Sequence, residues 1–142
     1  MPELGSENLQ YQWLERLEQK HHQSLYELYS KEWWTQNRSY EDVINMLAHC
    51  DVIITCCDMQ DRVVGFARVL TDYTFKALIF DVIIDETARG QGLGQEIVSR
   101  IIRHPDLQKV QSFELYCPER LIPFYEKQGF VRGSSCLMFQ QP

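Results

Sequence analysis

Apolar residues recur along the chain at two different spacings. Alternating or β-branched apolar runs predict strands, and apolar residues three or four positions apart predict helices. The expected strands are residues 9–14, 51–58, 62–70, 75–84, 110–117, 130–131 and 135–140, the last two forming a C-terminal hairpin. The expected helices are residues 18–32, 39–49, 93–104 and 118–128. This order predicts an α+β fold, and 142 residues suit one compact domain over 1–142.

Single residues support several of these boundaries. Ser39 is a candidate N-cap, and Pro105 cannot continue the helix before it. Pro123 is tolerable in a first helical turn, and Gly129 stands where glycine commonly follows a helix. Gly65, inside an expected strand, predicts a bulge in a hairpin that we expect in the middle of the sheet.

Three closely spaced glycines, Gly90, Gly92 and Gly94, join the strand 75–84 to the helix that follows. Glycine lets a ligand approach the backbone, and the free N–H groups of a first helical turn suit a phosphate or pyrophosphate. Gly94 is followed by Gln95-Glu96 rather than Lys-Ser or Lys-Thr, and glycine spacing does not match a dinucleotide fingerprint. ATP, GTP and NAD are therefore disfavoured, and a plain strand-to-helix turn stays open as the alternative.

Two motifs together resemble the GNAT acyltransferase superfamily. The first is Arg89-x-x-Gly92-x-Gly94, which is similar to the acetyl-CoA loop of that superfamily. The second is Phe124-Tyr125-x-x-x-Gly129-Phe130, some thirty residues further on. The order of the expected elements is also similar to the minimal GNAT fold, so the resemblance covers nearly the whole chain.

The resemblance implies a mixed, mostly antiparallel sheet of about seven strands flanked by about four helices, splayed between its fourth and fifth strands. Acetyl-CoA would be the co-substrate, its pantetheine arm lying in the gap along the backbone of Val82, Ile83 and Ile84. A segment that we call the phosphate loop would hold the pyrophosphate. Its residues are Arg89, Gly90, Gln91, Gly92, Leu93, Gly94 and Gln95.

The resemblance gives Tyr125 the role of a donor to the departing CoA thiolate. Full proton transfer from a tyrosine to a thiolate is uphill by roughly 2 kcal/mol in water, so a hydrogen bond is the better description. The alternative is a packing residue. An amine acceptor must lose a proton, for which Asp81 is our candidate base. A structural pairing of Asp81 with an arginine such as Arg68 is the alternative, and Glu119 and Asp72 are weaker candidate bases.

The resemblance also implies an acceptor pocket, but it does not identify the acceptor. Candidate pocket residues, which could equally be core, are Trp33, Trp34, Arg38, Tyr73 and Phe75. Many superfamily members carry asparagine where this chain has Pro118, which puts any contact made there in doubt. The first hypothesis is an N-acetyltransferase in which a primary amine, of a small molecule or a peptide, attacks acetyl-CoA directly in a ternary complex. The second is a module that binds CoA without turnover.

Composition narrows the partners. The net charge of −6 with scattered basic residues argues against nucleic acid, and no apolar run approaches the ~20 residues of a membrane span. The five cysteines include no Cys-x-x-Cys pair, so we expect reduced thiols and no metal. The first ten residues lack the basic and apolar regions of a secretory signal, which predicts a cytoplasmic protein. A homodimer stays open.

Overall fold

A five-stranded sheet forms the centre of the protein, whose computed structural model describes residues 10–142. The strands lie in sequence order: β1 (Gln12–Leu14), β2 (Val52–Cys57), β3 (Val63–Thr71), β4 (Lys76–Ile84) and β5 (Ser112–Leu115). The first four pair antiparallel, and β5 runs parallel to β4. The β2–β3 hairpin lies inside the sheet, as predicted. The first expected strand began at Leu9, which lies outside the described residues.

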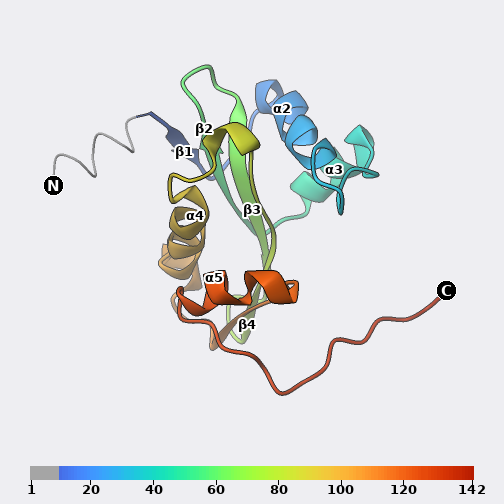
Figure 1. Cartoon of the computed structure of the whole chain (residues 1–142), viewed down its shortest axis with the longest axis vertical. Helices are drawn as coiled ribbons and strands as arrows, with labels where there is room; N and C mark the ends of the chain where they lie inside the picture. Colours follow the sequence, from blue (N-terminus) through green and yellow to red (C-terminus); the bar gives the residue numbers. More distant parts are fainter. Residues whose placement is uncertain (1–9) are drawn as a thin grey trace, which may run out of the picture.

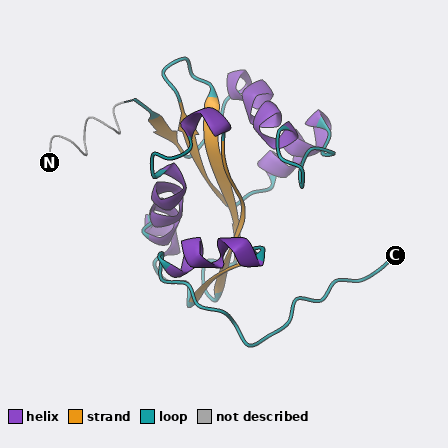
Figure 2. Cartoon of the chain, viewed as in Figure 1, coloured by secondary structure: helices purple, strands orange, loops and turns teal. Residues whose placement is uncertain are grey.

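Helices cover both faces of the sheet (Figures 1 and 2). On one side lie α2 (Gln19–Ser30) and α3 (Tyr40–Ala48), and on the other lies α4 (Leu93–Ile102). The short α5 (Ile122–Glu126) follows β5. The described part of the chain also has three 3-10 turns, η1 (Glu86–Ala88), η2 (Pro105–Leu107) and η3 (Glu119–Leu121). The mixed α+β class and the four α-helices of residues 10–142 agree with the sequence prediction.

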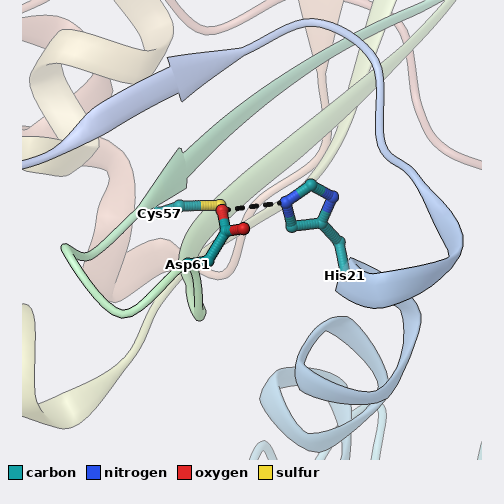
Figure 3. A group of neighbouring side chains, drawn as sticks. All are labelled: His21, Cys57 and Asp61. Carbon is teal, nitrogen blue, oxygen red and sulfur yellow. Dashed lines mark hydrogen bonds and ion pairs between the residues drawn. The ribbon is translucent and has the colours of Figure 1, made fainter.

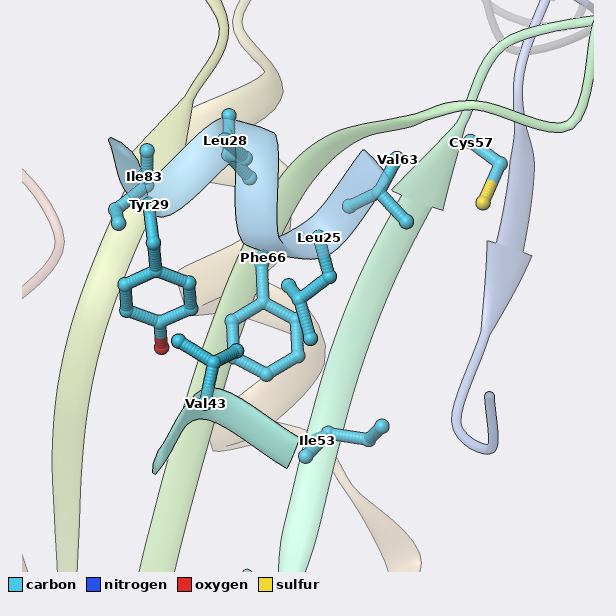
Figure 4. Close-up of a cluster of buried hydrophobic side chains, with 9 residues drawn as sticks. All are labelled: Leu25, Leu28, Tyr29, Val43, Ile53, Cys57, Val63, Phe66 and Ile83. Carbon is cyan, nitrogen blue, oxygen red and sulfur yellow. The ribbon is translucent and has the colours of Figure 1, made fainter. Parts of the chain in front are cut away.

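Buried apolar clusters on both faces hold the helices to the sheet. The α2–α3 face buries Tyr29, Phe66 and Ile83 among other apolar side chains (Figure 4). The α4 face buries Ile97 and Ile101 against small residues of β3 and β4. Burying one large aliphatic side chain contributes about 1.5–3 kcal/mol, so these two interfaces supply most of the drive to fold. None of the helices described is both long and apolar enough to cross a membrane.

Helix starts follow local chemistry. Ser39 caps α3, its hydroxyl accepting from the N–H of Asp42, as the sequence predicted. A reciprocal cap between Glu18 and His21 starts α2. Pro123 lies in the first turn of α5.

The predicted C-terminal hairpin is wrong. Residues 131–142, which we call the C-terminal arm, contain no strand and run away from α5 (Figure 1). Alternation in 135–140 suggested a strand, but a strand requires a partner edge and a face to bury, and this arm has neither. Its apolar side chains stay exposed, 60% for Leu137 and 73% for Phe139. The sheet therefore has five strands in the described chain rather than about seven.

A bulge interrupts β4 at Asp81. Arg68 pairs with Phe80 and Phe66 with Ile83, so two residues of β4, Asp81 and Val82, face one residue of β3. Asp81 has φ +58°, a left-handed conformation that aspartate tolerates better than most residues. The extra residue shifts the alternation of β4 by one. A second irregularity lies in the β2–β3 pairing, where Cys56 faces Gly65 and Cys57 faces Val63. The extra residue is Val64, directly before the Gly65 at which a bulge was predicted.

Candidate active site

The second half of β4 has an open edge. The β4–β5 pairing ends at Ile79 and Leu115, whereas β4 continues to Ile84. Backbone groups alternate sides along a strand, and the N–H of Asp85 bonds to Val64 of β3. The main-chain groups of Ile83 therefore face β3, and those of Val82 and Ile84 face the gap. An extended amide ligand could add there as a strand.

The phosphate loop contains a left-handed glycine, Gly92, directly before α4, and its last three residues form the start of that helix. Gly90 and Gly92 have φ values of +79° and +78°, which side-chain-bearing residues rarely adopt. Gly92 is the N-cap of α4 and accepts from the N–H of Glu96. The N–H groups of the first turn have no partner within the helix and are available to an anion. A Cβ at Gly94 would lie 3.3 Å from the ring of Phe124, so this glycine allows α4 to approach α5.

Two long-range contacts hold the phosphate loop, and a third holds Asp85 just before it. Lys31 Nζ lies 2.9 Å from Asp85 Oδ1, and Arg89 Nη2 lies 2.8 Å from Glu32 Oε1. The Tyr11 hydroxyl donates to the side-chain oxygen of Gln91 at 2.8 Å. The buried Asp85 also caps η1; burial opposes its ionisation, but bonds from Thr87 and Lys31 lower its pKa to about 2. The loop is thus shaped before any ligand arrives.

Tyr125 lies on α5 with its ring packed edge-on against Phe124 and Phe130. The residue is 8% exposed, and among the described residues no hydrogen bond is recorded for its hydroxyl. Burial, with a smaller effect of Cys117, raises the pKa of Tyr125 to about 12. It is therefore protonated at neutral pH and can donate a hydrogen bond.

Asp81 is the centre of an ion cluster that we call the Asp81 cluster, formed with Tyr29, Arg38 and Arg68. Its Oδ2 accepts from the Tyr29 hydroxyl at 2.8 Å, from Arg38 Nη1 at 2.9 Å and from Arg68 Nε at 2.7 Å. The Asp81 side chain is only 5% exposed. The guanidinium of Arg68 also lies over the ring of Phe80, 4.8 Å from its centroid.

The cluster sets the ionisation of Asp81. Burial alone would raise the pKa of the carboxyl, but the bonds from Arg38 and Arg68 outweigh it and lower the pKa. A carboxylate held in this way is a weak base. The geometry thus favours the alternative raised above, in which Asp81 pairs with Arg68, and it adds Arg38 and Tyr29 to that pairing.

The five candidate acceptor residues do not come together. Arg38, Trp33 and Trp34 share the α2–α3 loop, which buried Thr35 anchors through its hydroxyl to the carbonyl of Tyr29. Tyr73 and Phe75 instead lie at the β3–β4 turn. Phe75 is six residues before Asp81, or about 20 Å along a strand.

An aromatic that the sequence did not point to is Tyr116, which follows β5. Its ring centroid lies 6.3 Å from that of Phe80, so it stands beside the Asp81 cluster, and the residue is 61% exposed. The one available signal was its place directly after β5, where the strands diverge.

The remaining candidate bases lie at the surface. Asp72 Oδ1 accepts from the N–H groups of Thr74, Phe75 and Lys76, which shapes the β3–β4 turn. Glu119 is exposed at the start of η3, directly after Pro118.

In the chain from residue 10 onward, one group could offer three metal ligands, His21, Cys57 and Asp61 (Figure 3), whose ligand atoms lie within 4.8 Å of one another. His21 Nδ1 accepts from the N–H of Glu18, so in a neutral ring the proton is on Nε2, facing Asp61 at 3.1 Å. Burial raises the pKa of Cys57 to about 11, and Lys20 pairs with Asp61 at 2.6 Å. These side chains already cap α2 and form an ion pair. A metal would have to displace the protons of His21 Nε2 and the Cys57 thiol, and Lys20 from Asp61.

Known proteins share this fold. The chain resembles an acetyltransferase from Deinococcus radiodurans R1, at a TM-score of 0.80 and 24% identity over 92% of this chain and 89% of that one. It also resembles a GNAT-family protein from Xanthomonas campestris pv. campestris. The TM-score is 0.77 and the sequence identity 22%, over 93% of this chain and 94% of that one. Because both sequence identities are below 25%, these likenesses show a shared fold only.

Sequence relatives include one algal and one plant protein. The chain is 34% identical over 89 residues to "Uncharacterized N-acetyltransferase ycf52" of Porphyra purpurea, which is 61% of this chain and 51% of that protein. It is 34% identical over 71 residues to "Histone acetyltransferase TAP1" of Glycine max, 50% of this chain and 31% of that protein. The chain thus spans about half of these relatives' length or less.

The family comparison covers most of the fold. The model of the acetyltransferase (GNAT) family matches residues 11–130, from β1 to the residue after Gly129. This span contains the open edge of β4, the phosphate loop and Tyr125. The chain belongs to the acetyltransferase (GNAT) family.

Proposed function

We propose that the protein transfers an acetyl group from acetyl-CoA to a primary amine by direct attack in a ternary complex. What supports this is the combination of three features in residues 10–142: an open strand edge, a helix that starts at a left-handed glycine, and a buried tyrosine whose hydroxyl has no hydrogen-bond partner among these residues. The first fits an amide-bearing arm, the second a pyrophosphate, and the third a leaving thiolate.

Each group has one task. Val82 and Ile84 hold the arm through main-chain bonds, and the phosphate loop holds the pyrophosphate. Acetyl-CoA supplies the thioester. The neutral amine nitrogen bonds to its carbonyl carbon, the carbon–sulfur bond breaks, and the sulfur leaves as a thiolate. The nitrogen then releases one of its protons to water, which gives the neutral amide. Tyr125 donates a hydrogen bond to the thiolate. With a pKa of about 12 for Tyr125 and about 8.5 for a thiol, complete proton transfer is uphill by about 5 kcal/mol.

The proton of the acceptor ammonium leaves by another route. Removing it costs about 4.6 kcal/mol at pH 7 for a lysine-like amine. We assign Asp81 the task of holding Arg38 and Arg68, because its lowered pKa makes it a poor base. Water takes the proton, and Glu119, exposed at the start of η3, is the candidate carboxylate that we propose to assist it.

The acceptor is tested with a panel of amines. The names of two relatives point to different acceptors, a histone for the Glycine max protein and serotonin for "Serotonin N-acetyltransferase 2, chloroplastic" of Oryza sativa, 29% identical over 97 residues. That stretch is 66% of this chain and 48% of the rice protein. A lysine peptide, an arylalkylamine and amino acids should therefore be compared.

The assay follows thiol release from acetyl-CoA. Tyr125→Phe should lower kcat by about ten- to a thousand-fold with little change in acetyl-CoA affinity, since only the hydroxyl is lost. Tyr116→Phe is the matched control and should leave the chemical step unchanged. Equal rates for the wild type and Tyr125→Phe would leave Tyr125 as a packing residue.

The second candidate is binding of CoA without turnover. It rests on Pro118, which has neither an N–H nor a side-chain donor for the gap, and on the engagement of Asp81 by two arginines. CoA binding by calorimetry, together with no thiol release across the panel, would support it.

A further inference from the structure

The Asp81 cluster carries more positive than negative charge. Arg38 and Arg68 both bond to the one carboxylate of Asp81, and among residues 10–142 no other ion pair is recorded for either arginine. Lys76 and Glu114, on the paired part of β4 and β5, bind each other at 3.3 Å and add no net charge. One positive charge therefore stays uncompensated at this place, in a protein of net charge −6.

Two donor atoms of Arg38 are available to a ligand. Its Nη1 bonds to Asp81, and within the described part of the chain no hydrogen bond is recorded for its Nε or Nη2. Nε and Nη2 lie on one edge of the planar guanidinium, an arrangement that binds a carboxylate through two parallel bonds. The side chain is 36% exposed, and its Cζ lies 5.2 Å from the centroid of the Tyr29 ring. The guanidinium is therefore held in place but open to a second anion.

This open edge lies beside the proposed acetyl-transfer site. Arg38 contacts the residue directly before Val82, whose main-chain groups face the gap in the sheet. Arg68 pairs with Phe80 across the two strands, and the ring of Phe80 lies 6.3 Å from that of the exposed Tyr116, which follows β5. The two arginines and the two rings thus line the same side of the gap, the side of α2.

We propose that the amine acceptor also carries a carboxylate, which binds Nε and Nη2 of Arg38 while its apolar body packs against Phe80 and Tyr116. This rests on the acetyl transfer proposed above, and it narrows the acceptor to amino acids and related amines. A protonated arylalkylamine brings only a positive charge, which the uncompensated arginine charge repels. A lysine side chain within a peptide brings no carboxylate with its amine.

Calorimetry with two acetylated products measures the carboxylate contact without turnover. N-acetylphenylalanine and N-acetylphenethylamine differ only in the carboxylate, and each is titrated into the full chain loaded with CoA. The wild type should bind N-acetylphenylalanine about tenfold more tightly or better, because a hydrogen bond to a charged group has about that effect. Arg38→Gln should bring the ratio of the two affinities near one. Arg38→Lys, which keeps the charge but loses the planar edge, should keep part of the ratio.

The matched control is Arg103→Gln, at the end of α4 on the other face of the sheet, where the arginine is 69% exposed. This variant should keep the wild-type ratio. Mere damage to the Asp81 cluster would weaken both products alike and leave the ratio unchanged. If Arg38→Gln fails to fold, the wild-type ratio and Arg38→Lys decide. Equal affinities in the wild type, an unchanged ratio in both Arg38 variants, or no binding of N-acetylphenylalanine at millimolar concentration overturns the proposal.

Thiol release with phenylalanine and with phenethylamine tests acetyl transfer separately. Release from phenylalanine should be the faster at equal acceptor concentration. Equal kcat/KM for the two amines would leave acetyl transfer standing and refute the carboxylate contact. A carboxylate preference in product binding, with no thiol release from any amine, would instead support the contact and refute acetyl transfer.

Discussion

Replacing Asp81 by asparagine keeps the shape of the side chain and removes its charge. In the wild type one carboxylate oxygen accepts from Tyr29, Arg38 and Arg68. In the variant the two guanidinium groups lose their counter-charge. The loss of stability depends on how well water can solvate the two guanidinium groups in place of the carboxylate.

Burial decides the magnitude. Removing one partner of a buried ion pair costs about 3–5 kcal/mol. Arg68 is 16% exposed, so most of this penalty applies there, whereas Arg38 is 36% exposed and water screens its charge. We therefore expect a loss of about 2–4 kcal/mol in the free energy of unfolding, or about 6–12 °C in Tm for a chain of this size. The exposed Asp106→Asn is the control, with a change within about 0.5 kcal/mol.

The effect should depend on pH in one direction. Because the folded pKa of Asp81 is lowered, its stabilisation is present above the unfolded value near 3.9 and is lost as pH falls through the folded value. Urea unfolding at several pH values should show the full difference between wild type and variant at pH 7. The difference should shrink below about pH 4.

The same variant separates positioning from base catalysis. If Asp81 holds the arginines, activity should fall by a similar factor at every pH, together with Tm. If Asp81 is the base, the deficit should shrink at high pH, where the amine is already neutral. An unchanged Tm with a rate defect confined to low pH would refute our assignment.

Two further substitutions test the loop and the α4 interface. Acetyl-CoA at 100 times its Kd should stabilise the wild type by about 2.7 kcal/mol, and Gly92→Val should abolish this shift. Gly129→Val is the control, because Gly129 also has a left-handed φ of +95° but lies outside the phosphate loop; this variant should still be stabilised by acetyl-CoA. If both variants lost the stabilisation by acetyl-CoA, the loop would have no specific role in binding. Gly65→Ala places a Cβ 3.1–3.2 Å from three side-chain atoms and should cost about 1–3 kcal/mol in urea unfolding. If Gly65→Ala were as stable as the wild type, the side chains of the α4 face around Gly65 would be able to move apart and accept the added Cβ.

The elements that the sequence predicted correctly are those whose signals are local. The cap at Ser39, the glycines before α4 and the β-branched run of β4 each act within a few residues. The Asp81 cluster could not be predicted in full, because Tyr29 and Arg38 are 52 and 43 residues away in sequence. Only the pairing with Arg68 was foreseen, since neighbouring strands bring these two residues together.

The C-terminal arm shows the limit of alternation as a signal. Residues 135–140 alternate well enough to predict a strand, but a strand forms only where an edge is offered. That edge belongs to the tertiary or quaternary structure and leaves no trace in the arm itself.

The bulge at Asp81 connects both halves of the site. In a regular strand, Ala77, Ile79, Asp81 and Ile83 would share one face. The extra residue instead keeps Ala77 and Ile79 with Val82 and Ile84 on the α4 face and sends Ile83 to the α2 face. Asp81 thereby reaches Tyr29 and the arginines, while the main-chain groups of Val82 and Ile84 turn to the open edge. One inserted residue thus places the ion cluster on one side of β4 and the proposed cofactor edge beside it, so a change that removed the bulge should disturb both together.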